Sequence, residues 1–467
     1  MKATHVGLCM TEAARAAERP ALTPELLAAC GARYSRNNEG LEAILARVDP
    51  ANLDRSVDSI FRMIDYGHQS IADMVPVAIF IDGVSLWLAY YLWTLCPVSG
   101  GQESSTRYLR LAPEDLPDSE SFGIDGALRE EWHAAMSTAF SAYAASLQYW
   151  ENIAMENPSI TRIPKVVLED DSESGKRKAA RMRRNYAFDR ARYYIPVAAR
   201  TNVMLVMSAR AWVTVCDALF SHPLEEARKL ADILRSELGL CAPRLLKHAC
   251  AKPATQKGLA DEFESLAKTA AEPCPWLADD SKDACPSSVA VSIDKPNDIS
   301  DEDITTAFLH HDNRYAWIAQ AARRVVVRFA WDAVTMGEIR DLNRHRTGNK
   351  YCPLVPVGFY GACDQVPKGG DAAAVHDLFE TGRRLSARAR ELLAAGNPAY
   401  IYWSLLGTQY PFEHVTTADK FIYEAELRTG TGAHYQYALH LNDALEEWFK
   451  TFPATRTLIR PGQAEPE

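Results

Sequence analysis

The alternation of apolar and polar positions predicts the same pair of elements twice, far apart in the chain. Residues 75–82, Val-Pro-Val-Ala-Ile-Phe-Ile-Asp, form a short apolar run typical of a buried strand, and residues 83–95 are typical of an apolar helix. Residues 324–331, Arg-Val-Val-Val-Arg-Phe-Ala-Trp, again predict a strand. A helix is expected from about Thr335, with Gly348 as its C-terminal stop.

Most of the remaining sequence predicts helices. Strands are too sparse for a doubly wound parallel sheet, so the pattern favours an α+β fold in which helices cover a mixed sheet and helix dominates. Helical patterning covers residues 41–65, 130–157, 200–250, 373–395 and 417–452.

Clear periodicity is lost between residues 253 and 301, where Pro273-Cys274-Pro275 and an acidic run interrupt the helices. Such a stretch is typical of a linker. We therefore expect a first unit over residues 1–250, a linker over 251–305, a second and more diverged unit over 306–455, and a frayed tail over 456–467.

The composition, 47% hydrophobic and 24% charged over 467 residues, is that of a globular protein. A formal net charge of −10 argues against a nucleic-acid partner, so a phosphate group would need a local basic pocket.

The apolar run 84–98 is too short to span a bilayer, and the N-terminus lacks a signal-peptide core, so we expect a cytoplasmic protein without a membrane partner. The ten cysteines include no Cys-x-x-Cys pair, and no metal site is predicted.

A polar loop follows each predicted strand and helix. Residues 102–108 read Gln-Glu-Ser-Ser-Thr-Arg-Tyr, and residues 343–348 read Asn-Arg-His-Arg-Thr-Gly. Taken alone, Arg-His-Arg is a cationic helix end that complements the helix dipole. The presence of both loops favours a binding function, because arginine forms charge-assisted, bidentate bonds to phosphate and keeps its charge.

A strand, a helix ending in Arg-His-Arg and a loop with Glu-x-Ser-x-Arg resemble the flavin-dependent thymidylate synthases, in tandem-duplicated and diverged form. The resemblance extends over roughly residues 30–250 and is weaker from 310 to 440. It rests on Ala32-Arg33-Tyr34-Ser35, Gly67-His68-Gln69-Ser70, Glu103-Ser104-Ser105-Thr106-Arg107, Ala191-Arg192-Tyr193-Tyr194-Ile195-Pro196, Ser208-Ala209-Arg210, Arg344-His345-Arg346, Leu427-Arg428 and Ala433-His434-Tyr435-Gln436.

The resemblance implies methyl transfer to C5 of a uracil deoxynucleotide, dUMP to dTMP. FAD would be the cofactor, with NADPH and methylenetetrahydrofolate as co-substrates. Arg428 and Ser105 would be catalytic, Arg428 by favouring the N3-deprotonated uracil. The substrate contacts would be Arg107, Arg192, Ser105, Asp341 and Arg428, and the flavin contacts Arg344, His345, Arg346, His68, Ser70, Ser35, Glu103, Arg210 and His434.

Purely structural roles stay open for several of these residues. Ser70 can instead be a helix cap beside a packed His68, and Arg428 can be a surface helix residue. Asp341 stands where the resembled family has a glutamine near the nucleotide, and a carboxylate facing a phosphate would repel it. The alternatives are therefore a flavoenzyme of the same fold acting on another pyrimidine nucleotide or giving another one-carbon product, and a catalytically degenerate nucleotide- or flavin-binding protein.

The two halves lack complementary parts of the family pattern. The second half has Arg344-His345-Arg346 and Arg428 but no Glu-x-Ser-x-Arg loop, and Tyr400 replaces its phosphate arginine. The first half has the loop and Arg192, but Trp93-Thr94 and Leu219 replace the cations. We expect one working pocket and one blank pocket per chain, and a homodimer that acts as a pseudo-tetramer of repeats.

Overall fold

The computed structural model describes all residues except 36–39, 50, 66–68, 97–98, 280–283 and 463–467. His68, a predicted flavin contact, lies outside the described residues. The chain forms two compact units that are interleaved in sequence, whereas the predicted domains are consecutive. Unit 1 comprises residues 1–104, 120–123 and 200–263, and unit 2 comprises residues 105–119, 124–199 and 264–467.

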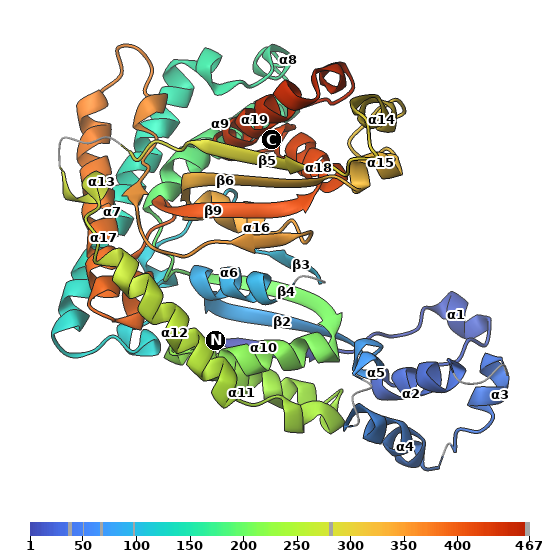
Figure 1. The fold of residues 1–467 in the computed structure, drawn as a ribbon. Helices are drawn as coiled ribbons and strands as arrows, with labels where there is room; N and C mark the ends of the chain where they lie inside the picture. The colour runs from blue at the N-terminus through green and yellow to red at the C-terminus, as the bar shows by residue number, and fades with distance from the viewer. Residues whose placement is uncertain (36–39, 50, 66–68, 97–98, 280–283, 463–467) are drawn as a thin grey trace. The chain divides into compact units, whose positions relative to one another are not determined.

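Unit 1 contains a four-stranded sheet in the order β1-β2-β4-β3 (Figure 1). The strands are β1 (Lys2–Val6), β2 (Pro76–Ser85), β4 (Arg200–Ser208) and β3 (Gly100–Glu103). The helices of this unit are α1 (Glu12–Ala16), α2 (Pro24–Tyr34), α3 (Leu41–Leu45), α4 (Leu53–Asp65), α5 (Ser70–Asp73), α6 (Leu86–Leu95), α10 (Ala209–Ser221) and α11 (Glu225–Gly239).

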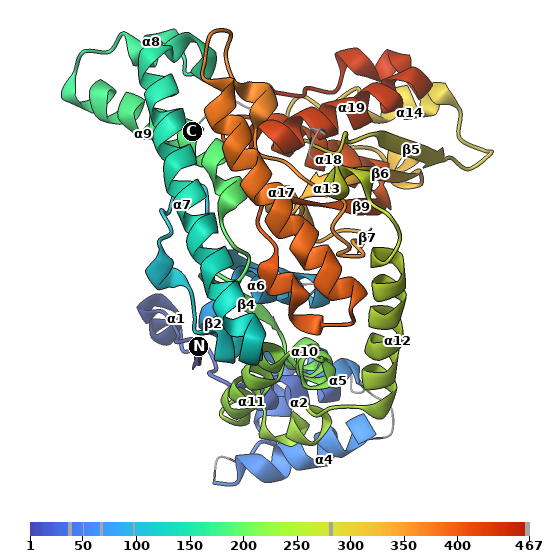
Figure 2. The ribbon, with the colours of Figure 1, turned by 90° about the vertical axis from the view of Figure 1, so that its left-hand side faces the viewer.

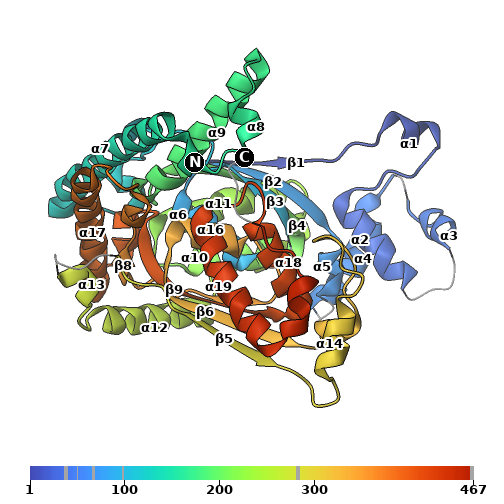
Figure 3. The ribbon, with the colours of Figure 1, turned by 90° about the horizontal axis from the view of Figure 1, so that it is seen from above.

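Unit 2 contains a second sheet in the order β5-β6-β9-β7, with β8 also paired to β9. Its helices α18 (Ala418–Thr429) and α19 (Tyr435–Thr451) pack on the face of this sheet, over β5, β6 and β9 (Figure 3). The strands are β5 (Val289–Asp294), β6 (Val326–Thr335), β9 (Thr408–Thr417), β7 (Asn349–Tyr351) and β8 (Gly358–Phe359).

Two long helices of unit 2, α7 and α17, lie side by side (Figure 2), and Arg388 of α17 forms a bidentate ion pair with Glu131 of α7. The helices of this unit are α7 (Gly126–Glu156), α8 (Lys165–Leu168), α9 (Glu173–Ala191), α13 (Pro275–Ala278), α14 (Asp301–Ala307), α15 (Gln320–Arg323), α16 (Met336–Asn343), α17 (Ala372–Ala394), α18 (Ala418–Thr429) and α19 (Tyr435–Thr451). Helix α12 (Pro253–Ala270) crosses the boundary between the units in sequence.

The two sheets repeat one topology. In each, the second strand in sequence has a bulge, at Asp82/Val84 in β2 and at Trp331/Val334 in β6. Each bulged strand runs into a helix whose N-cap hydroxyl accepts a backbone hydrogen bond, Ser85 for α6 and Thr335 for α16. The predicted α+β, helix-rich duplication is confirmed. The strand pairs of the described residues are antiparallel, so the predicted mixed sheet was wrong in that detail.

The predicted linker over residues 251–305 contains α12 and the strand β5, and β5 pairs along its whole length with β6. Gly348 has a positive φ of 66° but does not end a helix, because α16 already ends at Asn343. Among the described residues, no helix is both long and apolar enough to cross a membrane.

Candidate active site

The carboxylate of Asp341 is the centre of an arginine cluster in unit 2. Asp341 lies on α16 and is 7% exposed. Arg192 places Nη1 at 3.4 Å and Nη2 at 3.3 Å from Oδ2, and Arg344 donates to Oδ1. Arg428 donates from Nη2 to the Asp341 backbone carbonyl at 3.0 Å. Burial opposes ionisation, but the cations of Arg344, Arg192 and Arg428 hold the pKa of Asp341 well below its usual range, so the carboxylate stays charged.

Arg192 is the most buried member of this cluster. It opens the 3-10 turn η4 (Arg192–Tyr194), is 1% exposed, and donates from Nη2 to the carbonyl of Gly337. A Cβ at Gly337 would lie 2.7 Å from that nitrogen, so only glycine admits the guanidinium here without a shift. Arg192 comes from the first half of the sequence and Gly337 and Asp341 from the second, so both halves build this cluster within one chain.

Arg107, a predicted phosphate contact, is engaged by protein groups. Its Nε and Nη2 form a bidentate ion pair with Asp189 at 2.6 and 2.8 Å, and Nη1 donates to the carbonyl of Gly432 at 2.6 Å. Burial opposes ionisation of Asp189, but Arg107 lowers the pKa of that carboxyl. Ser105 accepts from the backbone N–H of Arg107 at 3.2 Å and so shapes the turn that carries it.

His345 and Arg428 form the part of the cluster with a neutral ring. Arg428 donates from Nε to Nε2 of His345 at 2.6 Å, which leaves the proton of the neutral imidazole on Nδ1. The pKa of His345 is lowered to about 3, mainly by burial. The carboxylate of Glu424 opposes this shift, and the cation of Arg428 adds to it. Arg428 also lies 5.6 Å from the ring centroid of Tyr437, within range of a cation–π contact.

The loop after α16 is fixed to β9. His414 on β9 lies 2.7 Å, through Nε2, from the carbonyl of Thr347, and its Nδ1 lies 3.0 Å from Glu424. Lys350 donates to the carbonyl of His345. A Cβ at Gly348 would collide with the carbonyl of Val415. Sequence reasoning gave His414 no role, whereas in the structure it contacts the loop that follows Arg344-His345-Arg346.

His434, a predicted flavin contact, is buried and caps α19. Its Nδ1 accepts from the N–H of Gln436 at 3.2 Å, and its Nε2 lies 2.9 Å from the carbonyl of Asp189. Burial lowers the pKa of His434 to about 4, so the ring is neutral at physiological pH. Both nitrogens are therefore used by the protein, which gives His434 a structural role connecting α19 to the end of α9.

Other predicted residues lie apart from the Asp341 cluster or in unit 1. Arg346 is an exposed residue of unit 2. In unit 1, Ser35 follows α2, and Ser70 is the exposed first residue of α5, whose N-cap is Gln69. Arg210 pairs with Asp73 at 2.8 Å, and Glu103 accepts from Nε1 of Trp93 at 3.2 Å.

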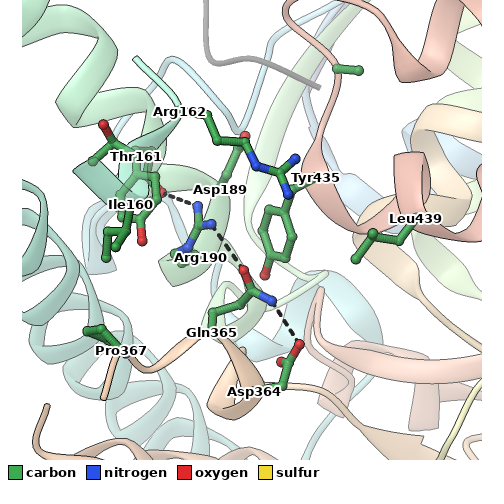
Figure 4. A pocket seen from close by; sticks show the side chains of 12 residues that line it. Ile160, Thr161, Arg162, Asp189, Arg190, Asp364, Gln365, Pro367, Tyr435 and Leu439 are labelled. Carbon is green, nitrogen blue, oxygen red and sulfur yellow. Dashed lines mark hydrogen bonds between the residues drawn. The ribbon is translucent and has the colours of Figure 1, made fainter. Parts of the chain in front are cut away.

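Sequence reasoning missed a cavity of about 230 Å3 in unit 2 beside Asp189 (Figure 4). Arg190 lines it, stacked 3.6 Å from the ring centroid of Tyr186 and 4.4 Å from that of Tyr435. The Tyr435 hydroxyl joins those of Tyr193 at 3.1 Å and Tyr360 at 3.3 Å. The one available signal was the position of Arg190, two residues before Arg192 on the same helix end.

Comparison with known proteins follows the first half of the sequence. Residues 21–244 match the family described as thymidylate synthase complementing protein. The UPF0159 protein Ta1429 of Thermoplasma acidophilum is 25% identical over 235 residues, covering 46% of this chain and 47% of the relative, so the chain spans about half the length of that relative.

The chain is also similar to a solved structure, the UMP/dUMP methylase PolB of Streptomyces cacaoi bound with 5-Br dUMP. The identity is 14% and the TM-score 0.30, with 48% of this chain and 89% of that chain covered.

Proposed function

We propose that this chain transfers a one-carbon unit to C5 of a uracil nucleotide, converting dUMP to dTMP, because residues 21–244 match the family described as thymidylate synthase complementing protein. The observation that carries the proposal is the convergence of Arg192, Arg344 and Arg428 on Asp341. Arg344 and Arg428 are partly exposed, so their cations can attract the phosphate group of a nucleotide.

The proposed roles follow from which groups stay accessible. Arg344, with a side chain 31% exposed, can reach the substrate while it pairs with Asp341. Arg428 would donate to the uracil and favour its N3-deprotonated form, and its bonds to His345 and Asp341 hold its orientation. Among the described residues the hydroxyl hydrogen of Ser105 has no acceptor, so it can donate to a phosphate oxygen.

FAD is the cofactor that the family implies, and the residues of the loop after α16 fit it. Arg344 is half-exposed and Arg346 exposed, so both cations can reach a ligand, and the neutral His345 between them adds no competing charge. We propose that Arg344, His345 and Arg346 hold the flavin and that their cations favour its reduced, anionic ring. Bound FAD would supply reducing equivalents taken from NADPH, for a one-carbon unit from methylenetetrahydrofolate. The assignments of Ser35, Ser70, Glu103, Arg210 and His434 to flavin stay predictions.

We propose one working pocket per chain, formed within that chain, and a homodimer of such chains. Support comes from Arg192 and Asp341, which stand 149 residues apart and pair in one chain. The residues expected at the blank pocket are used for packing: Leu219 is fully buried, and the Tyr400 hydroxyl donates to the carbonyl of Leu354 at 2.9 Å.

A second candidate keeps the flavin chemistry and changes the substrate. Asp341 already pairs with two of the arginines, and this weakens attraction for a phosphate dianion. A pyrimidine nucleotide with another phosphate arrangement, or another one-carbon product, would fit this internal neutralisation.

Two measurements test the proposal. Purified protein should show flavin absorbance or take up FAD on titration. If it did neither, both flavin-dependent proposals would be wrong. Expression in a thymidine auxotroph should restore growth, with tritium release from C5-labelled dUMP that is lost in Arg344→Ala. Flavin binding without complementation or tritium release would favour the second candidate.

The oligomer and pocket assignments have their own tests. Light scattering should give a dimer, and a monomer of about 52 kDa with FAD bound would contradict it. Nucleotide binding should reach about one per chain, and two per chain would refute the blank pocket. Arg344→Ala and Arg192→Ala should both be inactive, and mixing them during refolding should not restore activity if the pocket forms within one chain.

A further inference from the structure

The cavity beside Arg190 contains a buried cation with no anionic partner among the described residues. Arg190 is 8% exposed. Its Nη1 donates to the backbone carbonyl of Tyr186 at 3.2 Å and its Nη2 to the side-chain oxygen of Gln365 at 3.2 Å. Its Nε–H is buried and has no acceptor in the part of the chain that the structure describes. Every acceptor is therefore neutral, although a buried guanidinium is stable only when its charge is compensated.

The carboxylates that line the same cavity do not provide this compensation. Asp189 directs both oxygens to Arg107, at 2.6 and 2.8 Å. Asp364 accepts from the hydroxyl of Tyr360 at 2.7 Å and from the amide of Gln365 at 2.8 Å. The neutral amide of Gln365 thus stands between Asp364 and Arg190, as Figure 4 shows. Rings of Tyr186 and Tyr435 hold the guanidinium plane in place.

We propose that this cavity binds a small oxyanion, a phosphate monoester or a carboxylate, whose negative charge pairs with Arg190. The other lining residues supply a second cation, Arg162, a hydroxyl, Thr161, and an apolar wall of Ile160, Pro367 and Leu439 for the body of the ligand. A guanidinium fork suits both oxyanions. A volume of about 230 Å3 is below the roughly 300–1,000 Å3 of drug-sized sites, so the ligand is smaller than a dinucleotide.

This site is distinct from the Asp341 cluster, because Arg107, Arg192, Arg344 and Arg428 do not line the cavity. Its existence does not depend on the proposed methyl transfer. Asp189 connects the two: its side chain holds Arg107, and Arg190 is the next residue in the chain. An anion bound at Arg190 would therefore lie next to the carboxylate that fixes Arg107.

Thermal unfolding of the full chain tests the site. A ligand that binds the native state raises the unfolding temperature as its concentration rises. Inorganic phosphate, compared with chloride at equal ionic strength, should raise it for the wild type and for the control Arg184→Gln, an exposed arginine of the same helix. Arg190→Gln should lose at least half of this rise. An equal rise in all three proteins, or no rise in the wild type with either phosphate or benzoate, would overturn the proposal.

Gln365→Glu covers the case in which Arg190→Gln does not fold. It has nearly the size of the original side chain and places a carboxylate opposite Arg190. We expect its unfolding temperature to rise least with added phosphate, because the new carboxylate would pair with Arg190 in place of the ligand. A phosphate response equal to that of the wild type would contradict an anion site at Arg190.

Comparison of probes identifies the source of the oxyanion. The readout is the part of the rise that Arg190→Gln loses. For a phosphate-ester site this part should be larger with inorganic phosphate than with benzoate, and a carboxylate site should show the reverse order. Tritium release from dUMP is measured separately. If the protein binds phosphate at Arg190 but releases no tritium, this inference holds and the proposed function is wrong. If it releases tritium but does not bind phosphate at Arg190, the proposed function holds and this inference is wrong.

Discussion

Helices α6 and α16 occupy the same position in the two sheets, after a bulged strand and a hydroxyl N-cap, yet their buried faces differ. In α6 the buried residues are Leu86 to Tyr90, Leu92 and Trp93, all apolar or aromatic. In α16 every residue is buried, including Glu338, Arg340 and Asp341. Buried charges are costly unless each finds a partner. The second copy therefore has a charged helix whose burial must be compensated by partners, whereas the first uses the same position for apolar packing.

The same N-terminal groups are satisfied differently in the two copies. In unit 1 the N–H and hydroxyl of Ser85 donate to Glu226 of α11 at 2.8 and 2.7 Å. In unit 2 the hydroxyl of Thr335 donates to Glu338 of α16 itself at 2.8 Å, and His440 of α19 lies 2.9 Å from that carboxylate. The accepting glutamate thus lies on α11 in unit 1 but on α16 itself in unit 2. Helix α16 therefore carries one more buried carboxylate, which His440 of α19 contacts.

Removal of the central carboxylate should have the largest effect. Asp341→Asn leaves Arg192, 1% exposed, without its anion, and should lower the free energy of unfolding by about 3–5 kcal/mol. Urea denaturation measures this. The control Asp73→Asn removes the exposed partner of Arg210 and should cost less than about 1 kcal/mol. Equal losses in the two variants would show that Asp341 is not an essential counter-ion.

Acid should destabilise unit 2, because protonation of the buried, neutral His345 opposes folding. The pKa of His345 is about 3 in the folded protein, below the usual 6.5, so the unfolded chain binds the proton first and stability falls as pH drops below about 6.5. One such group contributes about 2 kcal/mol of loss between pH 6.5 and 5. Urea midpoints at pH 7 and 5 should therefore differ less for His345→Gln than for the wild type. An unchanged pH dependence would contradict a neutral buried His345.

A methyl group at Gly337 should have an intermediate effect. In Gly337→Ala the Cβ would lie 2.7 Å from Nη2 of Arg192, and such overpacking costs about 1–3 kcal/mol. The matched control is Gly258→Ala on α12, whose added Cβ meets no atom within 4 Å and should be neutral or stabilising. Because Arg192 must shift, nucleotide affinity should fall in the first variant only. Retention of both stability and affinity would show that Arg192 tolerates another position.

The smallest effect is expected from adding a cation to the apolar copy. Thr94 is exposed on the last turn of α6, so Thr94→Arg should change the free energy of unfolding by less than about 0.5 kcal/mol. Nucleotide stoichiometry should stay near one per chain, because Leu219 and Tyr400 still lack charge. Equilibrium dialysis would detect a second bound nucleotide, which would mean that a single arginine restores the blank pocket.

The sequence predicted the repeated elements because both copies of the second strand are long apolar runs. Residues 75–82 and 324–331 fall on β2 and β6, with each end within four residues. Strand β9 was missed because Pro411, Glu413 and His414 interrupt its apolar pattern. Strand β4 was absorbed into a predicted helix. Its burial alternates along the strand, but residues 203–207 are all apolar, so the sequence shows no period of two.

Individual arginines of the candidate site were identifiable from their motifs, but their partners were not. Arg107 and Asp189 are 82 residues apart and Arg192 and Asp341 are 149 apart, and no periodicity relates such positions. Sequence reasoning therefore assigned Arg107 to phosphate, whereas the fold engages it with Asp189 and Gly432. Arg190 was missed for the same reason, since its significance lies in the anion that its surroundings lack.

The pairing of Arg192 with Asp341 also bears on how the chain can be cut. A fragment ending near residue 250 would carry Arg192 and Arg107 without Asp341, and the remaining fragment would carry Asp341 without Arg192. The first fragment would leave the buried Arg192 without a carboxylate, and the second would leave Asp341 with Arg344 and Arg428 only. Each fragment should therefore be less ordered alone than when the other is present. The two fragments could therefore serve as a split reporter. Their reassembly would indicate that two proteins, each fused to one fragment, lie close together.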